Sequence, residues 1–234
     1  MTAILKRELV AFFKNPIGYF VLMIYAFLSA IVFTLFVVWQ NTSYLGSYFG
    51  MWLFIVDMVV IAIMSMRFFS EEKKNKTDQL LLTSPISLYS LVIGKFLGAY
   101  TILLSCTALN IIYIVIIDAF GVIDYGSLLS NVVGTVLILS AMVSIGIFIS
   151  ALTENQIAAA AGSFAVLFLL MIIDFFAIFM PAWLAKAMLH LNIYSQYEDF
   201  TNGVISIPPI IYYISVTVIF LFLTVKVIEK RRWN

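Results

Sequence analysis

The sequence IGYFVLMIYAFLSAIVFTLFVVW, residues 17–39, is apolar throughout and carries no charged side chain. A helix needs about 20 apolar residues to cross the hydrocarbon core of a bilayer. This stretch is long enough to do so. It is too long for the apolar part of a secretory signal peptide, and no clear small-residue cleavage site follows it. We therefore expect residues 17–39 to span a membrane.

The rest of the chain repeats this pattern. Of its 234 residues, 64% are hydrophobic and 11% are charged, whereas soluble domains average about 45–50% and about 25%. This composition excludes a soluble enzyme and a disordered protein. We expect an all-α membrane protein with one transmembrane domain over residues 1–234 and six spans. The five further spans are predicted at 50–69, 87–117, 128–152, 157–180 and 207–226.

Scarce residue types exclude several classes of site. Cys106 is the single cysteine, so no disulfide forms within the chain, and His190 is the single histidine. A multi-cysteine metal site and a bis-histidine haem site are therefore excluded. The net charge of +1 gives no sign of a nucleic-acid partner. We expect this chain to hold no metal and no cofactor of its own.

Residues 1–15, MTAILKRELVAFFKN, alternate apolar and charged side chains near helical spacing. We expect an amphipathic helix in the membrane interface, ending before Pro16. A longer polar segment, residues 181–206, precedes the last span and contains apolar residues such as Trp183. We expect it to form one or two short helices on the outer side.

The basic residues fix the orientation. If the N-terminus lies inside, Lys186 is the one basic residue among 13 that falls on the outer side. Such a bias places both termini in the cytoplasm. The tail from Glu229 to Asn234 then anchors the last span at the inner surface.

The most polar cytoplasmic stretch, residues 67–87, begins with charges and ends in Leu80-Leu81-Leu82-Thr83-Ser84-Pro85. A loop that only connects two spans does not need three leucines. A helix with an exposed apolar face is typical of docking onto another protein. The alternative is a solvated loop whose leucines touch lipid headgroups.

Several motifs resemble a known family. They are MRFFSEE at 66–72, LLLTSPIS at 80–87, GIFISALTENQ at 146–156 and YSQYEDF at 194–200. Together they resemble bacterial ABC exporter permeases of the type 2 superfamily, in particular the gliding-motility and nitrous-oxide-reductase-maturation type. The resemblance extends over essentially the whole chain.

The resemblance implies a division of labour. The permease would lie in the bacterial cytoplasmic membrane, and two cytoplasmic ABC ATPase subunits would bind ATP and Mg. A second permease, either another copy or a paralogue, would complete the transporter, with membrane lipids around it. Consistent with this, the sequence has no G-x-x-x-x-G-K-[ST] phosphate loop, and Gly94-Lys95 is only a fragment of one.

The resemblance also implies a coupling helix at Glu71–Pro85 and a second, smaller contact at the turn between spans four and five. An alternative for Glu154 is that it caps the fifth span with Thr153 as its partner. The expected ATPase-coupling residues are Glu71, Glu72, Thr77, Asp78, Leu80, Leu81, Pro85, Glu154, Asn155 and Gln156.

Two carboxylates fall within the predicted spans. Asp57 and Asp174 each lie about two turns from the outer end of a span. An ionised side chain at the bilayer centre costs at least about 2.5–3.5 kcal/mol, so such residues usually face protein or water. Both either line an outer vestibule on the translocation path or are hydrated at the interface. Asn110 is expected to hydrogen-bond a neighbouring helix.

The sequence therefore favours the permease of an ATP-driven exporter that moves an amphipathic or lipid-like substrate by alternating access. The alternative is a secondary transporter driven by an ion gradient. That class predicts an internal repeat and charges at the bilayer midplane, and we find no convincing repeat. An intramembrane protease is disfavoured because the one histidine lies outside the spans.

Overall fold

A computed structural model describes residues 2–42, 44–76, 87–177 and 179–233. The described residues form helices and no strand. Six helical segments are long and apolar enough to span a membrane, so the predicted all-α, six-span fold is confirmed. The segments are Pro16–Val38, Leu45–Lys74, Leu88–Phe120, Tyr125–Leu152, Gln156–Ala177 and Ile207–Arg231.

Three of the six segments are one continuous helix; Leu45–Lys74 is divided into three helices at Gly50 and Phe69, and the first and third segments change their helical winding. A π-helical turn, η1 (Thr34–Val38), extends the first span, and a 3₁₀ turn, η2 (Ala108–Asn110), interrupts the third. The helices are α1 (Thr2–Lys14), α2 (Pro16–Phe33), α3 (Leu45–Phe49), α4 (Met51–Phe68), α5 (Ser70–Lys74), α7 (Leu88–Thr107), α8 (Ile111–Phe120), α9 (Tyr125–Leu152), α10 (Gln156–Ala177), α11 (Ala182–Leu191), α12 (Ser195–Thr201) and α13 (Ile207–Trp233).

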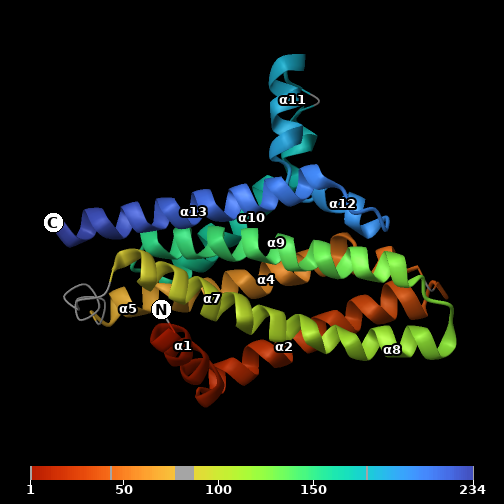
Figure 1. The fold of residues 1–234 in the computed structure, drawn as a ribbon, viewed down its shortest axis with the longest axis horizontal. Coiled ribbons are helices and arrows are strands. Elements are labelled where there is room, and N and C mark those ends of the chain that lie inside the picture. The colour runs from red at the N-terminus through yellow and green to blue at the C-terminus, as the bar shows by residue number, and fades with distance from the viewer. Residues whose placement is uncertain (1, 43, 77–86, 178, 234) are drawn as a thin grey trace.

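Helices α4 and α9 form the centre of the bundle, and the other spans surround them (Figure 1). Helices α2 and α10 pack against α4, while α13 and α7 pack against α9. Gly146 allows α9 to approach α4 closely, because a Cβ atom there would lie 3.1 Å from Cγ2 of Ile61. The apolar core therefore runs along the contact between these two helices.

A chain of polar side chains crosses the buried interior. Asn110 donates to the Tyr25 hydroxyl and accepts from the Tyr48 hydroxyl, each at 2.9 Å. This confirms the structural interpretation of Asn110. Asp57 is 3% exposed, and its carboxylate contacts the Tyr25 hydroxyl. Asp57 is therefore enclosed by protein rather than hydrated at the interface, and its place on the translocation path stays a prediction.

The N-terminal helix leaves the direction of the bundle at a sharp corner. The Asn15 side chain accepts from the backbone N–H of Ile17 at 3.1 Å, and Pro16 follows as the first residue of α2. A side-chain cap and a proline at this position start a new helix. Gly18 makes the corner tight, because a Cβ atom there would lie 2.1 Å from the carbonyl oxygen of Phe12. Helix α1 can therefore fold back onto α7.

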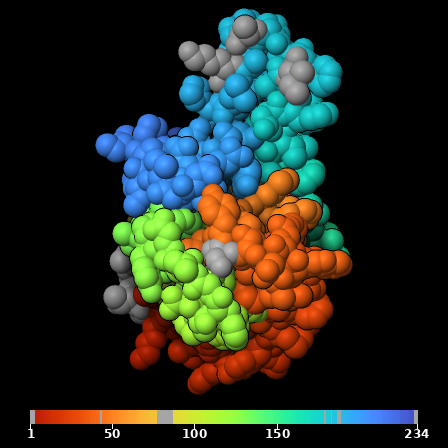
Figure 2. Space-filling view, turned by 90° about the vertical axis from the view of Figure 1, so that its right-hand side faces the viewer, coloured from red at the N-terminus to blue at the C-terminus, as the bar shows by residue number. Residues whose placement is uncertain are grey.

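Both ends of the chain lie at the same end of the bundle, as an even number of spans requires (Figure 1). We call it the basic end; it holds α1, α5, the turn between α9 and α10, and the last turns of α13. Figure 2 looks at the opposite end, where α11 projects sideways from the bundle next to α12. The expected short helices between 181 and 206 are present as α11 and α12, and their location on the outer side of the membrane stays a prediction.

Candidate functional site

The corner between α4 and α5 is held in place by the end of α9. The first amide groups of a helix have no partner within it, and Phe69, which precedes α5, makes no side-chain cap bond. The Ser150 hydroxyl from α9 accepts instead from the backbone N–H groups of Phe69 and Ser70, at 3.0 and 3.1 Å. Helix α9 thereby caps α5 from outside.

A lysine makes the return contact. The ammonium group of Lys73 donates to the carbonyl oxygen of Ala151. This carbonyl belongs to the last turn of α9, where the helix dipole favours a cation. Helices α5 and α9 therefore satisfy polar groups at each other's ends. Movement of α5 is consequently linked to α9.

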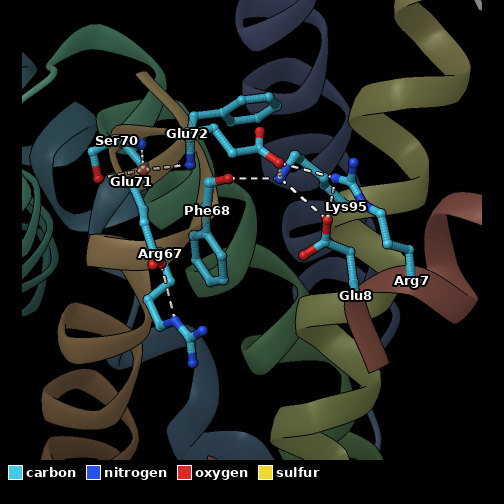
Figure 3. Close-up of polar contacts among 10 residues, drawn as sticks. Arg7, Glu8, Arg67, Phe68, Ser70, Glu71, Glu72 and Lys95 are labelled. Carbon is cyan, nitrogen blue, oxygen red and sulfur yellow. Dashed lines mark hydrogen bonds and ion pairs between the residues drawn. The ribbon is translucent and has the colours of Figure 1, made fainter. Parts of the chain in front are cut away.

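Next to this corner, Lys95 of α7 lies between two carboxylates (Figure 3). Its Nζ atom lies 2.9 Å from Oε1 of Glu72 in α5 and 3.3 Å from Oε1 of Glu8 in α1. Arg7 contacts the same two carboxylates, at 2.9 and 2.8 Å. We call Arg7, Glu8, Glu72 and Lys95 the ionic latch, because they connect α1, α5 and α7.

Burial makes this latch stronger than a surface ion pair. The Lys95 side chain is 2% exposed and that of Glu72 is 17% exposed. Lys95 also donates to the carbonyl oxygen of Phe68 at 2.7 Å and lies 5.0 Å from the centre of the Phe69 ring. A buried cation is tolerated when such partners replace its water, and removal of one partner is costly.

The charges around Glu8 also stabilise the ionised form of the latch. Burial by itself raises the pKa of the Glu8 carboxyl, but the positive charges of Lys95 and Arg7 lower it further than burial raises it. The net effect holds the pKa of Glu8 below its usual value. The folded latch therefore favours the ionised carboxylate, and α1 is attached most firmly when Glu8 carries its charge.

The two predicted coupling carboxylates are thus already paired within the chain. Glu72 belongs to the latch, and Glu71 contacts Nε of Arg67 at 3.1 Å, one helical turn earlier. The expectation that both pair with an ATPase stays a prediction, but in this structure their charges stabilise the α4–α5 corner. The expected coupling residues Thr77, Asp78, Leu80, Leu81 and Pro85 lie outside the described residues.

The second predicted contact, the turn between α9 and α10, has a different cap from the one considered. The Asn155 side chain accepts from the backbone N–H groups of Ile157 and Ala158, at 2.9 and 3.4 Å. Asn155 therefore caps α10, and the alternative that assigned this role to Glu154 is wrong. Glu154 instead points outward and contacts Arg231 of α13 at 2.6 Å. Gln156 begins α10.

Apolar side chains flank this turn in an exposed position. Leu152 is 56% exposed and Ile157 is 73% exposed. They lie on either side of the polar sequence Thr153–Gln156, at the same end of the bundle as exposed Asn75. Exposed apolar residues bordered by polar groups are typical of a contact surface.

The remaining candidates lie elsewhere. Asp174 is exposed, near the end of α10, and accepts from the backbone N–H of Phe175 at 3.0 Å. Both interpretations of Asp174, as a lining of the translocation path or as a carboxylate hydrated at the interface, therefore stay predictions. No group of three or more His, Cys, Asp or Glu side chains in the described part of the chain is placed to hold a metal ion.

The sequence alone did not predict that Arg7, Glu8 and Lys95 act together. The signal was present: Lys95 is a charge inside an apolar stretch, and the amphipathic segment 1–15 carries two adjacent charges of opposite sign, Arg7 and Glu8. It also missed Ser150, because a serine near the end of an apolar span carries no distinctive pattern.

A family model described as "ABC-2 family transporter protein" matches residues 44–230. The match includes α3 to α12, most of α13, and both turns described above. No curated protein matches the chain.

Proposed function

The chain belongs to the ABC-2 family of transporter proteins, and from this premise we propose that it exports a substrate with energy supplied by a separate ATPase. Family membership makes the chain a transmembrane permease subunit without an ATP site of its own. It is a multi-pass membrane protein. Export, the substrate class and the mechanism are our proposal, as is a specific kinship with the gliding-motility and nitrous-oxide-reductase-maturation type.

We assign the basic end to the cytoplasm of a bacterial cell, because basic residues gather there. Two ATPase subunits would bind ATP and Mg and would dock at this end on each of two permeases, the second being a copy or a paralogue. The docking surface would include α5 and the α9–α10 turn. This proposal is supported by the exposure of Asn75, Leu152 and Ile157 beside the hydrogen-bonded α4–α5 corner.

The observation that carries the coupling proposal is the connection of α5 to three other helices. Glu72 links α5 to α7 and α1, and Ser150 links it to α9. A push on α5 from closing ATPase subunits would therefore move these helices together. Coupling requires that the two conformations bind ATP or substrate differently, and a tightly connected α5 is suited to select between them.

The substrate is proposed to be amphipathic or lipid-like. Among the described spans, charged side chains concentrate at the basic end, and Asp57 is buried within the protein. A wide aqueous path for a highly charged solute does not fit this lining. The alternative, a secondary transporter driven by an ion gradient, would use a charge near the middle of the bilayer and would need no ATPase.

The first test is purification of the chain from its own cells in mild detergent, followed by mass spectrometry. We expect an ATP-binding protein in stoichiometric amount. Recovery of the permease alone, under conditions that keep it folded, would contradict the proposal and would favour the ion-coupled alternative.

A variant pair sharpens the test. Ile157→Ser removes an exposed apolar side chain from the proposed docking surface, whereas Val122→Ser removes an 89% exposed one at the opposite end of the bundle. Loss of the ATPase with the first variant and retention with the second are expected. Equal retention with both would exclude the α9–α10 turn as a contact.

A further inference from the structure

A cavity of about 290 Å³ lies at the basic end, between α1, α2, α4 and α7. Its size is at the lower limit of ligand sites, which hold about 300–1,000 Å³. Apolar side chains from three spans form one part of its wall, among them Val21, Ile63 and Ile102. The ion pairs of α1 and the α4–α5 corner form the other part.

This division follows the depth of the membrane. The apolar part belongs to the spans, and the charged part belongs to α1, α5 and the adjoining ends of α4 and α7, where the sequence leaves the hydrocarbon region. Phosphate groups of lipids lie at this level, outside the hydrocarbon core. A ligand that fits both parts has a polar head and an apolar chain.

The charged part has unused hydrogen-bond donors. Nε of Arg67 donates to Glu71, but its Nη1 atom is buried and has no partner in the described structure. Both ion pairs of Arg7 use Nη2, and its side chain is 46% exposed. Guanidinium groups bind phosphate oxygens through paired N–H donors. The vacant donors therefore suit a phosphate better than an ammonium group.

The rim as a whole is neutral. Three basic side chains, Arg7, Arg67 and Lys95, face three carboxylates, Glu8, Glu71 and Glu72. A neutral rim does not attract anionic lipids in general, unlike a basic surface. The arginines of such a rim select for the phosphate. The neighbouring carboxylates tolerate a lipid whose head group also carries an ammonium.

We propose that this cavity binds one phospholipid of the adjoining leaflet, with its phosphate at Arg67 and Arg7 and the start of an acyl chain against Val21 and Ile63. Binding concerns the permease alone, so it depends neither on the direction of transport nor on an ATPase. A bound lipid would fill the space between α1 and the spans and would add to the contacts that hold α1 in place.

The test is native mass spectrometry of the full chain in detergent, titrated separately with phosphatidylethanolamine, phosphatidylglycerol and diacylglycerol of equal chain length. We expect both phospholipids to bind with similar affinity and diacylglycerol to bind at least about tenfold more weakly, since charge-assisted hydrogen bonds are lost. Equal binding of diacylglycerol, or binding of phosphatidylglycerol alone, would overturn the proposal.

Three variants locate the site. Arg67→Gln removes the phosphate donor, and Ile63→Phe fills the apolar part without changing any charge; both are expected to weaken phospholipid binding about tenfold. Arg231→Gln is the control, because Arg231 lies at the same end but does not line the cavity. Wild-type affinity in Ile63→Phe, which leaves all ion pairs in place, would refute binding at this site.

Discussion

The coupling between Glu72 and Lys95 is the most decisive energetic prediction. Their charged atoms lie 2.9 Å apart, which corresponds to a Coulomb attraction of about 6 kcal/mol at an effective dielectric constant of about 20. Desolvation of the buried ammonium offsets much of this energy. We therefore expect a net coupling of about 2 kcal/mol in a double-mutant cycle of Glu72→Gln and Lys95→Met.

The assay is reversible unfolding of the purified chain by sodium dodecyl sulfate, followed by helical circular dichroism. The same cycle on Lys226 and Glu229 is the control, because this pair is also close, at 2.7 Å, but exposed on α13. Exposed pairs contribute little to stability. A Glu72–Lys95 coupling no larger than that of the control would refute the argument that burial strengthens the latch.

Three further predictions concern the same end of the molecule. Gly98→Leu should destabilise the packing of α1 on α7 by about 1–3 kcal/mol and speed proteolysis of α1, because a Cβ atom there would lie 2.8 Å from Cβ of Glu8. Asn155→Ala should lower the free energy of unfolding by about 1 kcal/mol through loss of the α10 cap, whereas Glu154→Gln should leave it unchanged in the same denaturation assay. The pKa of Glu8 is lowered in the folded chain. The contribution of Glu8 to the free energy of unfolding should therefore be complete above its usual pKa and should decline as the pH falls through its lower pKa in the folded state. Glu8→Gln should remove this acid dependence from a series of unfolding curves measured at different pH.

The large features of the fold follow directly from the sequence. Long uncharged stretches such as residues 17–39 have one stable arrangement in a bilayer, a helix that satisfies its own backbone. Pro16 and Asn15 likewise mark the corner between α1 and α2. These features depend on neighbouring residues, so a single sequence is sufficient to predict them.

The contacts of the site were harder to predict because they join distant parts of the chain. Glu8, Glu72 and Lys95 are separated by more than 20 residues in sequence, and no local pattern specifies which charges will meet. The expected ATPase-coupling role of Glu72 stays a prediction, but its contacts with Arg7 and Lys95 were not foreseen. The alternative role of Glu154 as a cap is wrong, since Asn155 directly precedes α10 and has the shorter side chain that reaches its backbone.

The buried position of Asp57 shows a similar limit. Depth along a span was predictable, but the side of the helix that faces protein was not. Tyr25, which comes from another span and is itself bonded to Asn110, supplies the polar contact of the carboxylate, while Oδ1 of Asp57 has no hydrogen-bond partner among the described residues. The carboxylate of Asp57 therefore has a protein partner that its position in the sequence did not reveal.

Contact between the basic end and an ATPase is central to the proposed function, and site-specific photo-crosslinking in intact cells tests this contact most directly. A photoreactive residue is placed at Asn75, which is exposed at the end of α5, or at Tyr125, which is 67% exposed at the opposite end. We predict a crosslink from position 75 to an ATP-binding protein and none from position 125. A crosslink to that protein from neither position, or from position 125 alone, would contradict the account.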